Sequence, residues 1–348
     1  MITMEKLRSL AESLHIDGIG ALKARVFHEL TPILEKRLQE HRVTAFEESD
    51  LALRIDPFQI MAEAETIVII ATSYYLNTKD DQEETLPLSG KLARFAWGLD
   101  YHRILHQQLK LMGEALQQLE SGLLYQTFVD TGPMVERYLA VQASMGLYGR
   151  HNCLIVPGVG SYVVLGGLLI NKPVAGSQQT SLPLTSCEGC GQCQRACPSQ
   201  ALEKPGQIDP GRCLSHLLQQ KETIPQEMRH LMEDRLYGCD VCQEACPHNR
   251  KPVSASHPEM IASVKQRCLD LPHLLSLSNR QFNRHYRTTA FGWRGQKVMQ
   301  RNALMALGNS HDQSVLPVIQ PFFQHPRKEL QEMAKWASNH LLNDNSNV

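Results

Sequence analysis

The chain has 348 residues, 42% of them hydrophobic and 20% charged, a globular composition with enough length for two or three domains that each hold a core. Its formal net charge is −1, and its apolar runs fall well short of the roughly 20 residues of a membrane helix. Charged side chains interrupt the start of the chain, which therefore lacks a signal peptide, so we expect a monomeric cytoplasmic protein with no membrane partner.

The first part of the chain alternates helical and extended patterns. Residues 5–15 place leucines at a helical spacing, residues 16–21 are typical of a short strand, and a second helix is expected over 30–38. Residues 65–76 are apolar and β-branched in their first half, which is typical of a strand buried on both faces. A helix followed by a buried strand predicts an α/β layer.

A long helix is predicted from Tyr101 to Leu119, after a polar loop at 77–90. Its apolar side chains recur every three or four residues, which is the period of an amphipathic helix. Asp100 directly precedes this helix, and its carboxylate can accept from the free N–H groups of the first turn. We therefore favour a capping role for Asp100 over a catalytic one.

Asp130 follows a short apolar strand and precedes a glycine turn. A carboxyl group at such a strand end is placed for ligand contacts in α/β folds. If a large cofactor partly desolvated it, this carboxyl group could keep its proton near neutral pH and act as a general acid. Turn chemistry, in which the aspartate bonds its own backbone two residues on, explains the position equally well.

Residues 145–172 combine apolar strands with many glycines, which lets backbone come close to a ligand. No GxGxxG stands between a strand and a helix there, so nothing supports a nicotinamide site. Cys153 lies in an apolar run of this stretch, and we interpret it as a small buried hydrophobic side chain.

Two cysteine runs, 187–198 and 239–247, carry the most specific signal in the chain. The first has the CxxCxxCxxxCP spacing of bacterial ferredoxins, whose fourth cysteine binds the other cluster when two are present. The second run has Leu236 where its first cysteine would stand, and Cys213 is the one cysteine between the runs. The eight thiolates of two [4Fe-4S] clusters then divide into one set of Cys187, Cys190, Cys193 and Cys246 and another of Cys197, Cys213, Cys239 and Cys242.

Other uses of these cysteines fit less well. A zinc site needs four ligands rather than eight. A disulfide framework suits a short secreted chain with little core. The sequence therefore predicts electron transfer through iron-sulfur clusters.

The end of the chain is predicted to be helical, and Cys268, at its start, is interpreted as structural. Amphipathic segments with short turns resemble HEAT-type stacking. Residues 271–311 contain no Asp or Glu but several basic residues with interleaved aromatics. Such a block can neutralise phosphates and stack on bases, although a solvated helical face with a few buried aromatics would look similar.

With these motifs assembled, the chain resembles the epoxyqueuosine reductase family, cobalamin-dependent iron-sulfur enzymes that complete queuosine in tRNA. The resemblance covers nearly the whole length. RLYGCDVCQ and the basic WRGQKVMQRNALMALGN are its more specific parts. It is carried by GLDYHRIL (98–105), VDTGP (129–133), GRHNCLI and GSYVVLG (149–166), the cysteine runs, RCLSHL (212–217) and QRNALMALGN (300–309).

The resemblance implies an α+β multidomain protein that reduces epoxyqueuosine in the tRNA anticodon. It implies an α/β cobalamin-binding domain over 1–180, a ferredoxin-like domain with two [4Fe-4S] clusters over 181–255, and a HEAT-like tRNA-binding domain over 256–348. A low-potential electron donor, such as a flavodoxin, a ferredoxin or a reductase, would supply the electrons.

The resemblance also implies site residues. Asp130 matches the family's proposed proton donor. Cobalamin contacts are expected at Asp100, Tyr101, His102, Gly160, Ser161 and Tyr162. Contacts with tRNA are expected at Arg284, Arg287, Arg294, Lys297 and Arg301.

The chain departs from the family's pattern at Gly146 to Arg150, where a Gly-Trp-x-Gly-Lys is common, and at Arg94 to Ala96. Contacts assigned to that Trp or Lys cannot be carried over. Two alternatives remain: another corrinoid iron-sulfur reductase, such as a reductive dehalogenase, and an electron carrier without chemistry of its own.

Overall fold

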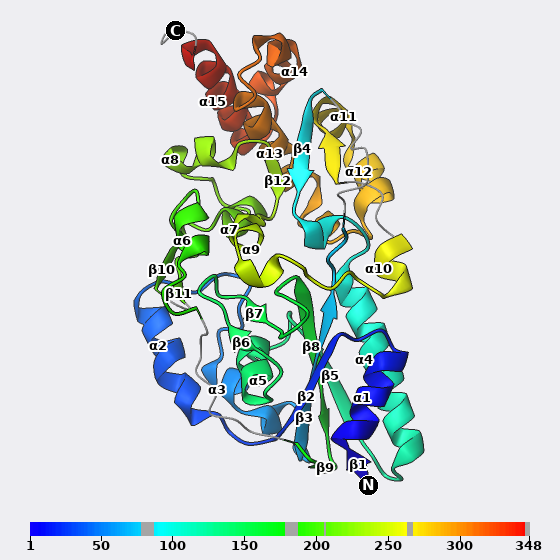
Figure 1. Cartoon of the computed structure of the whole chain (residues 1–348). Helices are drawn as coiled ribbons and strands as arrows, with labels where there is room; N and C mark the ends of the chain where they lie inside the picture. Colours follow the sequence, from blue (N-terminus) through cyan, green and yellow to red (C-terminus); the bar gives the residue numbers. More distant parts are fainter. Residues whose placement is uncertain (78–86, 178–186, 205–206, 263–266, 345–348) are drawn as a thin grey trace.

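The structure, a computed structural model, describes residues 1–77, 87–177, 187–204, 207–262 and 267–344. Figure 1 shows the N-terminal sheet and the C-terminal helices at opposite ends of the molecule, with the cysteine-rich segment between them. The predicted loop at 77–90 and the linker before Cys187 lie largely outside the described residues.

A four-stranded sheet forms the centre of the N-terminal part. Its order is β2-β3-β8-β5, and each neighbouring pair is antiparallel. Strand β3 is buried at every residue, which confirms the prediction of a strand covered on both faces. The strands are β2 (Gly18–Lys23), β3 (Thr66–Ser73), β5 (Tyr125–Val129) and β8 (Val163–Ile170).

The antiparallel pairing corrects the expectation of an α/β layer, because that class is built on parallel strands. The rule that ligands bind beyond the carboxyl ends of parallel strands therefore does not apply to Asp130. Continuous apolar runs predicted burial on both faces correctly but carry no information about strand direction. The fold is α+β.

Helices pack on both faces of this sheet. Side chains of α1 and α4 share one apolar core with Val68 and Ile70, and side chains of α2 and α5 share another with Ile67 and Ile69. Successive side chains of a strand point to opposite faces, so β3 contributes to both cores. The helices are α1 (Met4–Ser13), α2 (Thr31–Gln39), α3 (Leu51–Ile55), α4 (Tyr101–Leu119) and α5 (Glu136–Gln142).

Short strand pairs complete the N-terminal part. Strand β1 (Ile2–Thr3) pairs with β9 (Val174–Ala175), and β6 (Leu147–Tyr148) pairs with β7 (Leu154–Ile155). The glycine-rich stretch thus holds the strand β8 and a small hairpin.

The cysteine-rich segment is built from short elements. Hairpin β10–β11 and helix α7 separate the two cysteine runs, and α9 carries the second. The elements are α6 (Gln192–Ala196), β10 (Leu202–Lys204), β11 (Gln207–Ile208), α7 (Leu214–Gln219), α8 (Gln226–Arg229), β12 (Arg235–Tyr237) and α9 (Val241–Glu244).

A three-stranded sheet joins distant parts of the chain. Its central strand β4 (Ser89–Leu92) pairs with β12 on one side and with β13 (Cys268–Asp270) on the other. Cys268 therefore lies in a strand, and the C-terminal part is not all-helical as predicted. Strands of three and four residues have no readable period, and their partners are far apart in sequence, so no local pattern could indicate this sheet.

The C-terminal helices pack on that sheet and on one another. Helices α13 and α15 come so close that a Cβ at Gly308 would lie 2.8 Å from the Ala337 Cα. Among the described residues, no helix has the length and apolar character needed to cross a membrane. The helices are α10 (Pro258–Ala262), α11 (Leu271–Ser276), α12 (Asn279–Tyr286), α13 (Gly295–Gly308), α14 (Leu316–Ile319) and α15 (Lys328–Asp344).

Candidate functional site

Asp130 lies directly after β5 and is held by two side chains from the start of α4. The Tyr101 hydroxyl donates to its Oδ2, and His102 Nε2 lies in ion-pair contact with its Oδ1. The Asp130 side chain is still 42% exposed, so it can reach a bound substrate.

Asp100 completes this group from the other side of His102. Its carboxylate caps α4 by accepting from the His102 backbone N–H at 3.1 Å, which agrees with the predicted capping role. The same oxygen lies 2.6 Å from His102 Nδ1. The structure thus brings together Asp100, Tyr101, His102 and Asp130, four of the predicted site residues.

The two carboxylates keep His102 positively charged. Burial lowers the pKa of His102, but hydrogen bonds and charges from Asp100 and Asp130 outweigh burial and raise it to about 10. His102 is therefore an imidazolium at neutral pH, and its positive charge lies beside the Asp130 carboxyl group. Burial, followed by the Asp130 charge, raises the pKa of Tyr101 well above its usual range.

Two further polar groups near this region escaped the sequence analysis. Glu136 begins α5, and its Oε1 is buried without a hydrogen-bond partner in the part of the chain that the structure describes. Burial, reinforced by the Asp130 charge, raises its pKa to about 8. An acidic residue in a first helical turn is usually explained by the helix dipole, so no sequence signal indicated the burial of Glu136.

His151 is the second such group. It is 3% exposed, and burial lowers its pKa to about 4. The Cys153 backbone N–H donates to its Nδ1 at 3.1 Å, so the neutral ring carries its proton on Nε2. That nitrogen is also buried without a hydrogen-bond partner among the described residues.

Three predicted cobalamin contacts are instead used inside the chain. Ser161 and Tyr162 are each 3% exposed. The Ser161 hydroxyl donates to Gln243 Oε1 at 3.0 Å and accepts from Asn249 Nδ2 at 2.8 Å. At Gly160, where φ is +105°, a Cβ would lie 2.6 Å from Asn249 Oδ1. These residues dock the glycine-rich stretch onto the second cysteine run, so they are not available to a cofactor.

The thiols of Cys187, Cys190, Cys193 and Cys246 are electrostatic neighbours. Burial and then the charges of Cys246 and Cys187 raise the pKa of Cys193. The pKa of Cys246 is raised by burial and by Cys187 and Cys190. These four cysteines form the first of the two predicted sets, although they come from both runs.

The second predicted set shows the same relation. Burial raises the pKa of Cys213, and the charge of Cys197 adds to it. Burial raises the pKa of Cys239 to about 11, with a contribution from Cys213. Burial raises the pKa of Cys242 well above its usual range, and the charges of Cys153, Cys239 and Cys213 add to this effect. The donor chemistry of both sets therefore fits iron-sulfur clusters, which take thiolate ligands.

No three His, Cys, Asp or Glu side chains of the described residues are arranged to hold a single metal ion. The assignment of particular cysteines to each cluster stays a prediction, which the crossed neighbour relations support.

Leu236 explains why the second run lacks its first cysteine. Its side chain is fully buried in the core shared with the C-terminal helices, and a Cβ at Gly90 would lie 2.4 Å from its Cγ. A cluster ligand could not occupy this position. Cys213 lies instead at the N-cap of α7 and next to Cys197.

The predicted tRNA contacts divide into exposed and engaged side chains. Arg284 and Arg287, at the end of α12, are exposed. Lys297 pairs with Glu329, and Arg294 Nε donates to the Gln219 carbonyl at 2.5 Å.

The prediction that Arg301 contacts tRNA is wrong. It is 4% exposed, and burial lowers its pKa to about 10. Its guanidinium donates to the carbonyls of Gln220 at 3.0 Å and Glu222 at 2.6 Å, so it cannot contact a phosphate. The charge pattern identified it as basic but could not show that the preceding segment folds over it.

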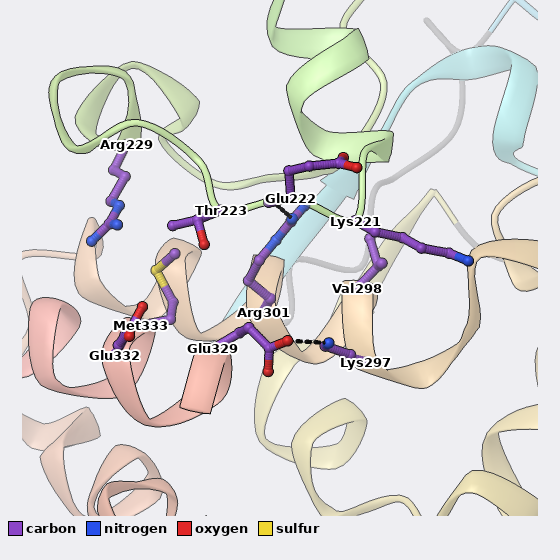
Figure 2. A pocket seen from close by; sticks show the side chains of 10 residues that line it. All are labelled: Lys221, Glu222, Thr223, Arg229, Lys297, Val298, Arg301, Glu329, Glu332 and Met333. Atoms are coloured by element: carbon purple, nitrogen blue, oxygen red, sulfur yellow. Dashed lines mark hydrogen bonds and ion pairs between the residues drawn. The ribbon is translucent and has the colours of Figure 1, made fainter. Parts of the chain in front are cut away.

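Figure 2 shows the small pocket above this arginine, between α13, α15 and residues 221–223. Arg301 points from α13 to the Glu222 backbone, and Lys297 reaches Glu329 across the opening. The space inside admits about one water molecule. This pocket is therefore too small for a nucleotide and lies apart from Asp130.

An α+β fold with two sets of four cysteines and a carboxyl group beside an imidazolium defines an iron-sulfur oxidoreductase. The sequence matches the family described as 4Fe-4S double cluster binding domain over residues 186–249, and the family described as epoxyqueuosine reductase QueG over residues 54–131.

Whole-chain relatives agree with these matches. The chain is 33% identical to an epoxyqueuosine reductase of Lactococcus garvieae over 97% of this chain and 96% of the relative. It is similar to a crystal structure of epoxyqueuosine reductase with an epoxyqueuosine-modified tRNA-Tyr stem loop, with a TM-score of 0.89 and 32% identity over 97% of this chain and 90% of that one. A Bacillus subtilis epoxyqueuosine reductase, described with its aspartate-bearing catalytic loop swung out of the active site, matches with the same score, identity and coverage. The chain therefore belongs to the epoxyqueuosine reductase family.

We predict that Asp100→Asn lowers the pKa of His102 from about 10 towards its usual value near 6.5, because one of its two negative partners becomes neutral. Asparagine still caps α4, so the fold persists. The raised pKa of His102 stabilises the folded state. This stabilisation is complete below about pH 6.5 and is lost as the pH rises through about 10. The imidazole signals of His102 in an NMR titration measure the change.

Asp270→Asn is the matched control, because Asp270 also caps a helix by accepting from a histidine N–H. It should leave the His102 titration unchanged. An unaltered titration in Asp100→Asn would show that Asp100 does not hold the imidazolium.

We also predict that Cys213→Ser impairs one cluster and spares the other. About half of the bound iron should be lost, because only one of the two sets loses a thiolate. Iron analysis and the EPR spectrum of the reduced protein measure this, with Cys268→Ser in β13 as the control. Loss of both clusters, or of neither, would contradict the assignment.

Proposed function

We propose that this chain reduces the epoxide of epoxyqueuosine in tRNA and leaves the cyclopentene of queuosine. Removal of the oxygen as water consumes two electrons and two protons. The observation that carries the proposal is the exposed Asp130 carboxyl group beside the His102 imidazolium, in a chain with two four-cysteine sets. Relatives that cover almost the whole chain are named for this activity.

Asp130 is the group that transfers a proton to the departing epoxide oxygen. Its exposed side chain gives it access to the substrate, and the positive charge of His102 beside its Oδ1 stabilises the carboxylate that remains after the proton has left. The Tyr101 hydroxyl orients the other carboxylate oxygen. Asp100 acts through His102, because it keeps the imidazole charged and fixes the ring by its contact with Nδ1.

The cysteine sets hold the two clusters that deliver single electrons to the site. Cobalamin, when bound, supplies the metal centre at which the carbon–oxygen bond is reduced. Glu136 Oε1 and His151 Nε2 suit such a cofactor, because one is a buried acceptor and the other a buried donor without partners among the described residues, and a corrinoid carries many amide groups. We therefore assign cobalamin contacts to Tyr101, His102, Glu136 and His151 in place of Gly160, Ser161 and Tyr162.

The exposed arginines of α12 provide a surface for the tRNA backbone. Arg284 and Arg287 lie in the stretch without acidic residues and remain free to meet phosphates. Arg301 ties α13 to the cysteine-rich segment, and Lys297 pairs with Glu329 of α15, so neither is assigned to tRNA binding. A low-potential flavodoxin, ferredoxin or reductase would donate the electrons.

The alternatives are less well supported. A reductive dehalogenase would not need a basic surface without acidic residues. A plain electron carrier would not need a carboxyl group beside an imidazolium. Relatives at 33% identity over nearly the full length are named as epoxyqueuosine reductases.

The decisive experiment loads the chain with iron, sulfide and cobalamin and supplies a reductant and tRNA carrying epoxyqueuosine. Mass analysis of the digested nucleosides should show conversion to queuosine. We predict that Asp130→Asn retains iron and cobalamin but lowers turnover about 100-fold or more, the contribution typical of a general acid.

Asp312→Asn, a change at an exposed helix cap, should leave turnover unchanged. Full activity of Asp130→Asn would remove Asp130 from the mechanism.

We further predict that replacing Arg284 and Arg287 by Glu weakens tRNA binding and lowers its salt dependence. The slope of log affinity against log salt should fall by about one for each phosphate contact that is lost. Equivalent changes at Arg8 and Lys110, exposed on α1 and α4, alter the net charge equally and should have little effect. If both pairs of substitutions weaken tRNA binding equally, the effect comes from the overall charge of the protein and not from contacts of Arg284 and Arg287.

A further inference from the structure

An exposed aromatic cluster joins two separate parts of the chain. Trp293 is 55% exposed and Phe46 is 40% exposed. Their ring centroids lie 6.0 Å apart at 70°. Phe46 comes from the loop between α2 and α3, and Trp293 comes from the turn before α13. We call Phe46, Trp293 and the adjoining Arg294 the aromatic platform.

The indole of Trp293 is fixed by its polar edge. Its Nε1 donates to the Tyr237 hydroxyl at 3.0 Å, and Tyr237 is 1% exposed. The Tyr237 hydroxyl lies 3.0 Å from the Ala290 carbonyl, to which it can donate. The apolar surface of the ring therefore stays in solvent in one orientation, which is unusual for a tryptophan whose polar group is already satisfied.

Arg294 lies against both rings of the platform. Its guanidinium carbon is 4.4 Å from the Trp293 ring centroid and 5.0 Å from that of Phe46. Its Nε donates to the Gln219 carbonyl at 2.5 Å, which holds the side chain in place. The positive charge and the two ring faces thus form one rigid surface.

The loop that carries Phe46 is also held firmly. Glu47 accepts from Arg37 at 2.7 Å and from Arg54 at 2.9 Å. It also accepts from the Thr44 backbone N–H at 3.1 Å. An aromatic side chain that served only to attach this loop would be buried by the contact, whereas Phe46 remains 40% exposed.

A chain of ring contacts connects the platform with the catalytic group. The Tyr237 ring lies 5.8 Å from that of Phe95, and Phe95 lies 6.3 Å from Tyr101. The Tyr101 hydroxyl donates to Asp130. A short series of side-chain contacts thus links the platform to Asp130.

We propose that the aromatic platform stacks an unpaired base of the tRNA beside the nucleoside that is reduced, an inference that rests on the proposed function. Proteins that bind single-stranded loops stack bases on exposed aromatic side chains and on arginine planes. Trp293 and Arg294 lie in the stretch without Asp or Glu, and Arg294 gives the platform a positive charge that can meet a phosphate. The platform recognises the face of a base and positions the anticodon loop.

The test measures binding of an anticodon stem loop to the fully loaded protein. Trp293→Ala should weaken binding about 5-fold to about 150-fold, the effect expected for the loss of one stacked base. Trp293→Phe, which keeps a ring, should bind within a few-fold of the unchanged protein. Phe46→Leu keeps the apolar volume without a ring and should also weaken binding.

Trp336→Ala is the matched control. Trp336 also has a histidine ring and an arginine against it, with ring centroids 5.0 Å apart for His340 and the Arg229 carbon at 5.5 Å, but it lies on α15 outside the acid-free stretch. Its loss should leave stem-loop binding unchanged. Quenching of tryptophan fluorescence by the stem loop should disappear in Trp293→Ala and persist in Trp336→Ala.

The outcomes separate this inference from the proposed function. If the unchanged protein converts epoxyqueuosine but Trp293→Ala and Phe46→Leu bind the stem loop normally, the platform does not contact RNA. If both variants instead slow reduction of the clusters by a reduced flavodoxin while stem-loop binding persists, the patch docks a protein and the inference is wrong. If the unchanged protein binds the stem loop through Trp293 but does not convert epoxyqueuosine, the proposed function is wrong. The inference that the platform stacks a base would still hold.

Discussion

The interaction on which the rest of the structure depends is the contact of Arg301 and Asn302 with the cysteine-rich segment. The Arg301 guanidinium satisfies carbonyls that follow α7, and Asn302 Nδ2 donates to the carbonyls of Leu218 and Leu236, each at 2.8 Å. Burying a charge is costly unless it is fully hydrogen-bonded, so this arrangement fixes α13 in one position. It thereby places Trp293 at the surface and keeps Leu236 in the core, which leaves the ligand role to Cys213.

Much of the fold could be predicted where the signal was local. The apolar run of β3, the period of α4 and the cap at Asp100 each depend on residues within one element, and the structure confirms them. The cysteine spacing also predicts two crossed sets, and this stays a prediction that the neighbour relations of the thiols support. The sheet β12-β4-β13, the burial of Arg301 and the docking of Ser161 depend on partners far away in sequence. No local period or charge pattern carries that information.

In the candidate site, too, some features could be predicted from the sequence and others could not. Asp130 could be recognised from its place before a glycine turn, but its protonation could not. A carboxyl group desolvated by a cofactor would keep its own proton, whereas this carboxyl group is exposed and is served by an imidazolium that two carboxylates keep charged. The charge that the structure establishes at this site is therefore that of His102, which Asp100 and Asp130 hold in its protonated form. Glu136 shows the opposite case, since burial raises its pKa to about 8.

The docking of Ser161 onto Gln243 and Asn249 has a thermodynamic consequence for the whole chain. Strand β8 begins two residues after Ser161, and Cys242 and Cys246 flank Gln243, so one hydrogen-bond network spans the sheet and the second cysteine run. Metal binding that orders the run is linked to folding. Iron loading is therefore expected to stabilise the packing of the N-terminal sheet against the second cysteine run as well as the ligands themselves.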